Sequence, residues 1–192
     1  NVYGEEWVQE AAKRGLNNFK DTPRAMDVWD DPRVISMFEE LNVLTKREIE
    51  ARKEIEFENY VYKLQIEARL MGDLTQNHII PAVINYQNKL ITNVKGLHEV
   101  LCEDGKEASS AQRELIVKIS MHLNKMKHLC DEMLEARKKA NKIEHAEEKA
   151  VAYCDEVKCY FDEIRYHADK LELLVDNEIW TLTKYREMLF TK

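Results

Sequence analysis

The sequence predicts an all-α fold, an antiparallel bundle of long, coiled-coil-like helices with short flanking helices. Only five glycines and three prolines occur in 192 residues, and 34% of the residues are charged. This composition is typical of long helices. Apolar residues recur at alternating steps of three and four over long stretches, the spacing of helices that pack as a coiled coil. No stretch alternates convincingly at period two, as a half-buried strand does.

Residues 1–44 predict an arm of short helices. A first helix is expected over residues 5–14, and a later one begins in "DDPRVISMFEELNV", with Asp31 as N-cap and Pro32 as the first helical residue. The chain begins at Asn1 rather than Met, so we expect it to be a piece of a longer protein, in which this arm follows an absent upstream domain.

Residues 45–192 predict the helical bundle. Thr45 and Glu48 form a capping box, in which hydroxyl and carboxylate each accept from the other residue's amide. No strong stop follows until "CEDGKEASS" at 102–110, so this helix is about 57 residues or roughly 85 Å long. Pro81 lies inside it and predicts a kink, because proline lacks the amide hydrogen that an interior position needs.

Two more long helices follow, and each keeps a heptad seam for three or more repeats. The phase slips near residues 141–146, where we expect a turn between antiparallel helices. After residue 177 an aromatic tail, "EIWTLTKYREMLF", predicts a last short helix. The seam residues are Ile116, Ile119, Leu123, Met126, Cys130, Met133, Arg137 and Ala140 in the first, and Ala150, Cys154, Val157, Phe161, Ile164, Ala168, Leu171 and Val175 in the second.

The bulk properties argue against several classes of partner. A formal net charge of -7 disfavours nucleic acid, which requires a basic surface. No apolar run approaches the roughly 20 residues of a membrane span, so no membrane partner is expected. The four cysteines form no CxxC motif, which favours reduced thiols and a cytoplasmic protein.

The motif search predicts no catalytic, cofactor-binding or metal-binding residue. A di-iron bundle needs Glu-x-x-His, in which two ligands share one helical face, but none of the six histidines follows an acid by three residues. His98 and Cys102 could share a zinc ion, yet a tetrahedral site needs four convergent ligands. Phosphate-binding glycine loops and the Gly-x-Ser-x-Gly elbow are also missing from the sequence.

The stretch "GDLTQNHIIPAV", residues 72–83, interrupts the long helix with polar side chains. One interpretation is a pocket around Asp73, Asn77 and His78 that senses a small molecule. The other is a buried polar layer at the kink, where Pro81 leaves a carbonyl free for neighbouring side chains. Polar seam residues usually specify helix packing, so we favour the second interpretation and expect Asn77 and His78 to face this chain's own core.

These residues also carry a family resemblance. "IEARLMGDLTQNHIIPAVINYQNKLI" (66–91) resembles the C-terminal region of type III glutamine synthetases. "EEWVQEAAKRGLNNFKDTPRAMD" and "ELNVLTKREIEARKEI" resemble the stretch that follows the catalytic domain of that family, and "VDNEIWTLTKYREMLF" resembles its C-terminal end. The resemblance covers nearly the whole chain.

The resemblance implies a parent enzyme that joins ammonia to glutamate with ATP and a divalent metal (Mg), in a homo-oligomer of two stacked hexamers. The family's ligands for nucleotide, metal and glutamate lie on a catalytic domain before Asn1, so none is carried over to this chain, and no cofactor is expected in it. The expected partners are the protein's own catalytic domain and sister subunits.

We therefore expect a structural role, in which this helical domain packs on the catalytic domain or at subunit interfaces. The candidate contacts are the polar layer and the aromatic tail. A free-standing module that binds partner helices, and a bundle that senses a small molecule, are the alternatives. The candidate structural and interface residues are Asp73, Gln76, Asn77, His78, Pro81, Trp180, Lys184, Tyr185 and Arg186.

Overall fold

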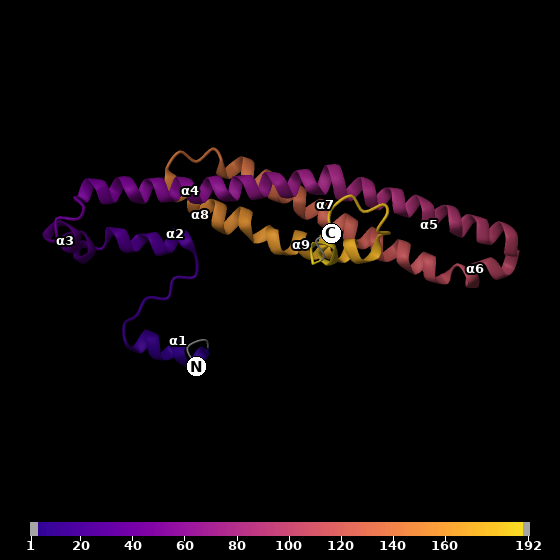
Figure 1. Ribbon diagram of the computed structural model, residues 1–192, viewed down its shortest axis with the longest axis horizontal. Coiled ribbons are helices and arrows are strands. Elements are labelled where there is room, and N and C mark those ends of the chain that lie inside the picture. Colours follow the sequence, from indigo (N-terminus) through magenta and orange to yellow (C-terminus); the bar gives the residue numbers. More distant parts are fainter. Residues whose placement is uncertain (1–3, 190–192) are drawn as a thin grey trace. The chain divides into compact units, whose positions relative to one another are not determined.

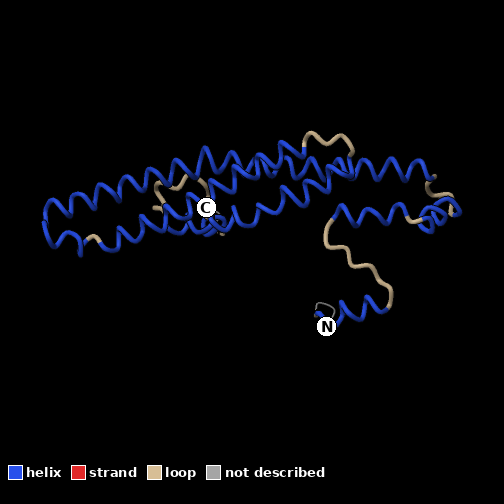
Figure 2. Tube along the Cα trace, turned by 180° about the vertical axis from the view of Figure 1, so that it is seen from behind, coloured by secondary structure: helices blue, strands red, loops and turns tan. Residues whose placement is uncertain are grey.

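The computed structural model describes residues 4–189, and it confirms the predicted all-α fold (Figure 1). Helices joined by short loops make up this part of the chain, and Figure 2 shows no strand in it. No helix among these residues is long and apolar enough to cross a membrane. By its internal contacts the chain divides into two units, which are described separately: residues 1–63 with 143–154, and residues 64–142 with 155–192. The division predicted at residues 44 and 45 stays a prediction.

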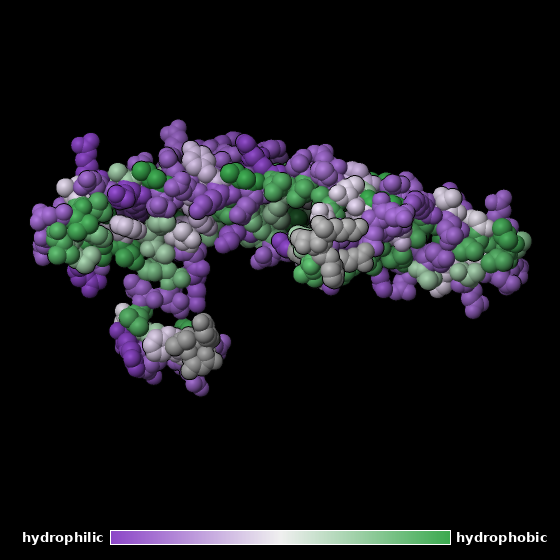
Figure 3. Space-filling model, in the orientation of Figure 1, coloured by the Kyte–Doolittle hydropathy of each residue, from purple (hydrophilic) through white to green (hydrophobic). Residues whose placement is uncertain are grey.

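The first unit contains the arm and the helices that accompany it. Neither α1 nor α3 has a buried residue, although both carry an apolar face. Hydrophobic (green) atoms accordingly gather on the surface where α3 lies (Figure 3). The helices are α1 (Glu5–Lys13), α2 (Thr22–Ala25) with the 3₁₀ turn η1 (Met26–Asp30), α3 (Pro32–Glu40), the first part of α4 (Lys46–Asp73), and α8 (Ala146–Ala152).

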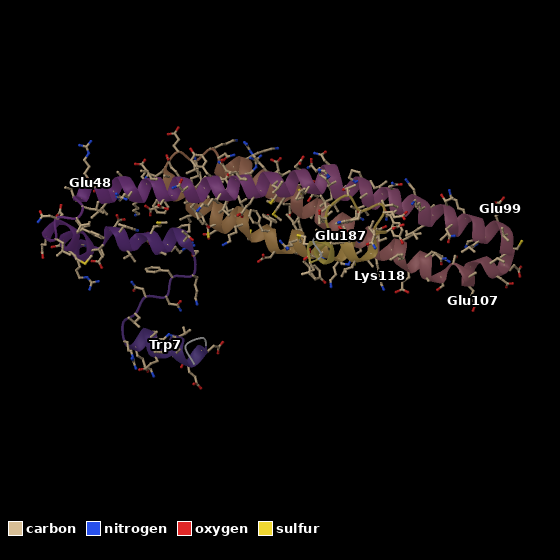
Figure 4. The ribbon with its side chains drawn as sticks, viewed as in Figure 1. Trp7, Glu48, Glu99, Glu107, Lys118 and Glu187 are labelled. Carbon is tan, nitrogen blue, oxygen red and sulfur yellow. The ribbon has the colours of Figure 1, made fainter. Side chains whose placement is uncertain are left out.

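The predicted helix starts in this unit are confirmed by their hydrogen bonds. Asp31 caps α3 by accepting a hydrogen bond from the Arg33 amide at 2.9 Å. In the capping box before α4, the Thr45 amide donates to the Glu48 carboxylate at 2.8 Å, and the Glu48 amide donates to the Thr45 hydroxyl at 3.4 Å. Glu48 is labelled at the start of α4 in Figure 4. The backbone hydrogen bond from Thr45 lowers the pKa of Glu48, because it favours the ionised carboxylate.

The second unit is a bundle in which α5 (Ile80–Leu101) and α9 (Phe161–Leu174) both pack on α7 (Ser110–Ala140). The seam predicted for α7 is confirmed, since Ile119, Met126, Cys130 and Met133 are fully buried. Helix α7 ends at Ala140 and α8 begins at Ala146, so the break predicted at 141–146 lies between them. The connecting segments are η3 (Cys102–Asp104), α6 (Gly105–Ala108), the π-helical η4 (Tyr153–Val157) and η5 (Lys158–Tyr160).

The turn from α5 into α7 depends on a close approach at Gly105. Figure 4 shows Glu99 and Glu107 on the two sides of this turn. Gly105 is buried, and a Cβ atom added to it would lie 2.7 Å from the Cα atom of His98 and 2.9 Å from the carbonyl oxygen of Leu97. Both atoms belong to the backbone, so they cannot move aside as a flexible side chain would. Only glycine fits this position without moving the end of α5.

We predict opposite effects for two glycine-to-alanine substitutions in this unit. Gly105→Ala lowers the free energy of unfolding by about 1–3 kcal/mol, because the new methyl group overlaps the backbone of α5. Gly96→Ala, the matched control inside α5, meets no atom within 4 Å and raises the free energy of unfolding by about 1 kcal/mol through helix propensity. Urea denaturation followed by circular dichroism measures both. Equal effects of the two substitutions would contradict the packing described here.

Candidate functional site

The polar stretch around Pro81 forms a π-helical turn, η2 (Leu74–Ile79), between α4 and α5. The amide of Ile80 donates to the carbonyl of Thr75, five residues earlier, which is the π-helical pattern. Pro81 then lies in the first turn of α5, where its missing amide hydrogen leaves no gap in the hydrogen bonding. The chain therefore stays helical through Pro81 and does not reverse there.

The π turn moves the buried face of the helix by one residue. A π turn contains an extra residue compared with an α turn. Thr75 is buried, but the next buried side chain is Ile79 rather than His78, and Val83 continues the face on α5. The seam therefore passes through η2 with its apolar residues still directed at the core.

The expectation that Asn77 and His78 face this chain's own core was wrong for Asn77 and holds only in part for His78. Asn77 is exposed, and its side-chain amide donates to the Asp73 carboxylate at 2.6 Å, one turn away on the same helix. Gln76 and Asp73 are exposed as well, and His78 is half-buried. The expectation for His78 holds only in part because it continued the 3.6-residue period through a turn that has another period, and the buried position passes to Ile79. Asn77 lies two residues after the buried Thr75, which places it off the buried face with either period. Roles for these residues in ligand or subunit binding stay predictions.

Thr75 is the one polar side chain of η2 that is buried in the core. It forms a hydrogen bond with the thiol of Cys130 on α7. Burial raises the pKa of Cys130, and the hydrogen bond with Thr75 partly opposes this effect. Cys130 is therefore a protonated, unreactive thiol in the core, as its seam position predicts.

A groove of about 650 Å³ lies beside η2, with α9 and the C-terminal segment as its other walls. Leu74, Ile79 and Trp180 give it apolar surface, and charged residues, Asp162 and Asp169 among them, also line it. Asp73, Asn77 and His78 do not line this groove. The structure therefore joins Asp73 and Asn77 by a hydrogen bond on the helix surface, but it places none of the three residues of the sensor interpretation in this groove.

The aromatic tail packs back on its own unit. Trp180 is 8% exposed and Lys184 is 7% exposed. The Lys184 ammonium donates to the carbonyls of Glu172 at 2.6 Å and Val175 at 3.2 Å. These carbonyls lie at the C-terminal end of α9, where a cation also interacts favourably with the helix dipole. Lys184 thus holds the tail against the end of α9, and its ammonium also lies 5.7 Å from the centroid of the Trp180 ring.

The predicted short helix at the C-terminus is α10 (Tyr185–Met188). Glu187, labelled in Figure 4, accepts a hydrogen bond from the Lys184 amide at 3.1 Å with its carboxylate. The side chains of Tyr185 and Arg186 lie outside the described part of the chain. Their contacts with other subunits therefore stay predictions.

Lys53 is a central residue of the first unit that sequence reasoning missed. Its side chain is buried in α4, and its ammonium contacts the carboxylates of Asp30 and, at 3.2 Å, Glu147. Burial by itself lowers the pKa of Lys53, but the hydrogen bonds to both carboxylates outweigh burial and raise it. Lys53 thus joins η1, α4 and α8. No sequence pattern predicts these contacts, because Lys53 is separated from Asp30 by 23 positions and from Glu147 by 94.

Within residues 4–189, no group of three or more His, Cys, Asp or Glu side chains is arranged to hold a metal ion. The five glycines of the chain also provide no phosphate-binding loop. The described residues therefore do not fit the Mg²⁺ ion and ATP that the resemblance implies for the parent enzyme.

The chain is similar in sequence to a known protein family and to several known proteins. The family described as "Glutamine synthetase C-terminal domain" matches residues 1–98. A glutamine synthetase of Bacteroides fragilis (strain YCH46) is 44% identical over 99% of this chain and 26% of its own length. A glutamine synthetase of Butyrivibrio fibrisolvens is 31% identical over 100% of this chain and 27% of its own length. A type-3 glutamine synthetase of Dictyostelium discoideum is 27% identical, again over 99% and 26%. The chain spans about a quarter of the length of these relatives.

We predict that Lys184→Met lowers the free energy of unfolding by about 2 kcal/mol, because two carbonyls at the end of α9 lose a charged donor. Amides in residues 175–184 should also exchange hydrogen faster. The matched control is Lys158→Met at an exposed position, with an expected change below about 0.5 kcal/mol. Denaturation and hydrogen exchange measure both variants, and unchanged exchange of the tail in Lys184→Met would refute the assignment.

Proposed function

Because the chain belongs to the glutamine synthetase C-terminal domain family, we propose that it is the non-catalytic helical domain of a glutamine synthetase subunit, and that it packs on the catalytic domain or on neighbouring subunits. The parent protein would join ammonia to glutamate with ATP and Mg²⁺ on residues outside this chain. The role of this domain is then to support the shape or assembly of the enzyme.

The observation that carries this proposal is the uncovered apolar face of the arm. Burial of apolar surface stabilises a complex by about 25 cal/mol per Å². A group of exposed apolar side chains therefore favours binding to a partner surface that covers it. The relatives are about four times as long as this chain, and protein of that kind can supply such a surface. The exposed large side chains of the arm are Val8, Leu16, Phe19, Val28, Met37, Leu41 and Val43.

Small-molecule sensing is a second candidate, and the apolar groove beside η2 is the observation that favours it. A volume of about 650 Å³ lies within the size range of small-molecule sites. None of Asp73, Asn77 and His78, the residues of the predicted sensor site, lines this groove, which makes this candidate the weaker one. A free-standing module that binds partner helices would use the same arm surfaces as the assembly role. The experiments below therefore use the full-length protein, in which only the assembly role predicts a change in oligomer mass or in glutamine synthesis.

The broad test is removal of residues 1–192 from the full-length protein, followed by measurement of the oligomer mass and of glutamine synthesis. We expect a smaller assembly, lower activity, or both. An unchanged mass together with unchanged activity would exclude the supporting role.

The sharper test compares two adjacent substitutions in α1 of the full-length protein. Val8→Asp places a charge on the apolar face of α1. If a partner surface covers Val8 in the full-length protein, burial of the valine contributes about 1.5–3 kcal/mol, and a buried charge opposes the contact. We therefore expect loss of packing of the arm and a shift to smaller assemblies. Gln9→Asp introduces the same charge at the next exposed position and should leave the assembly intact. Analytical ultracentrifugation measures the mass. Identical behaviour of the two variants would contradict a specific role for the apolar face.

A further inference from the structure

Two histidines meet between α7 and α9 in the second unit. The Nδ1 atoms of His122 and His167 lie 2.8 Å apart, and the centroids of the two rings are 5.1 Å apart. His167 is only 6% exposed, and His122 is half-buried. Two ring nitrogens at this distance need one proton between them, so one Nδ1–H donates and the other Nδ1 accepts.

The surroundings of the pair come from the same two helices. Tyr166 lies next to both histidine rings, with centroids 6.3 Å from His122 and 5.2 Å from His167. The charged groups that act on the pair are Lys125 on α7 and, on α9, Lys170 and Glu163. Because two of these groups are cations and only one is a carboxylate, their combined charge disfavours protonation of the two histidines.

Proton counting shows why this contact depends on pH. The neutral pair can take one extra proton on the Nε2 atom of the donor ring and keep the Nδ1–H···Nδ1 hydrogen bond. A second extra proton must bind to the Nδ1 atom that accepts. It removes the hydrogen bond and leaves two positive rings facing each other. Unfolded histidines bind both protons freely.

The pKa directions agree with this count. Burial, and then the charge of Lys170, lower the pKa of His122. Burial, His122 and Lys125 lower the pKa of His167, while Glu163 acts in the opposite sense. Because the folded values lie below the ordinary value of about 6.5, the unfolded chain binds more protons below that pH. The contact therefore makes its full contribution to the free energy of unfolding above about pH 6.5, and this contribution is lost as the pH falls below that value.

We propose that the His122–His167 contact is a pH-sensitive switch that keeps α9 packed on α7 near neutral pH and loosens this packing in mild acid. Loosening of α9 also affects other contacts that this helix makes. Helix α9 buries Ile164 and Leu171 and forms one wall of the groove beside η2. It also supplies the carbonyl of Glu172 that binds Lys184. The proposal rests on the contact and not on the function proposed above.

The test is hydrogen exchange of α9 amides in the full-length protein at pH 7.5 and pH 5.5, expressed as protection factors so that the intrinsic effect of pH on exchange is removed. Each proton that only the open state binds changes the opening equilibrium by up to tenfold per pH unit. We therefore expect protection of α9 to fall by about tenfold in the wild type, with a smaller change in α5.

Two variants separate the pair from other pH effects. His122→Gln keeps a polar side chain at a half-buried position but cannot take the proton, so protection of α9 should change much less between the two pH values. His128→Gln removes an exposed histidine from the same helix and should behave as the wild type. An equal fall in protection in His122→Gln and the wild type overturns the proposal.

The wild-type comparison stands by itself if His122→Gln does not keep α9 folded at pH 7.5. A fall of protection in α9 that exceeds the fall in α5 then supports the switch. Equal protection of wild-type α9 at both pH values, or equal falls in α9 and α5, overturns it.

Discussion

The missing amide hydrogen of Pro81 is the constraint on which the arrangement of the second unit depends. An α-helix can continue past an interior proline only if its hydrogen bonding is rearranged. Here η2 makes that rearrangement, with Ile80 bonded to Thr75 across five residues. The extra residue keeps Thr75, Ile79 and Val83 on the buried side and leaves His78 only half-buried. One local change thus sets both the core contacts with α7 and the polar surface of the stretch.

The buried polar groups of the two units serve packing. Thr75 hydrogen-bonds with Cys130, Lys184 donates to the end of α9, and Lys53 pairs with carboxylates from two other helices. A buried polar group without a partner costs free energy, so each of these residues stabilises one arrangement of its unit against alternatives. Exposed apolar side chains occur along the long helices as well, but α1 and α3 have an apolar face and no buried residue, and this is the surface to which we assign the supporting role in the enzyme.

Local signals in the sequence predicted much of the fold. The capping box at Thr45 and the Asp31 cap depend on neighbouring residues, and they are found where the sequence places them. The seams of α7 and α9 follow from hydrophobic period alone, because that period has one structural solution in a bundle. Pro81 announced a disturbance in the helix. The sequence did not indicate that a π turn would accommodate the proline, which is why the seam position expected for His78 is taken by Ile79.

The candidate sites were harder to predict than the fold, because they depend on contacts between distant residues. Lys53 and Glu147 are 94 positions apart, and the two histidines of the α7–α9 contact are 45 positions apart. Neither pair has a motif, and only the packed helices bring their atoms together. The family resemblance pointed to the parent enzyme, yet it could not indicate which surface of this domain meets other protein.

The most direct measurement of the central claim is a cryo-electron microscopy map of the full-length protein at side-chain resolution. The supporting role predicts that the exposed apolar side chains of α1 and α3, Val8 and Met37 among them, contact the catalytic domain or another subunit. A map in which these side chains remain in solvent, while the enzyme is fully assembled, would contradict it.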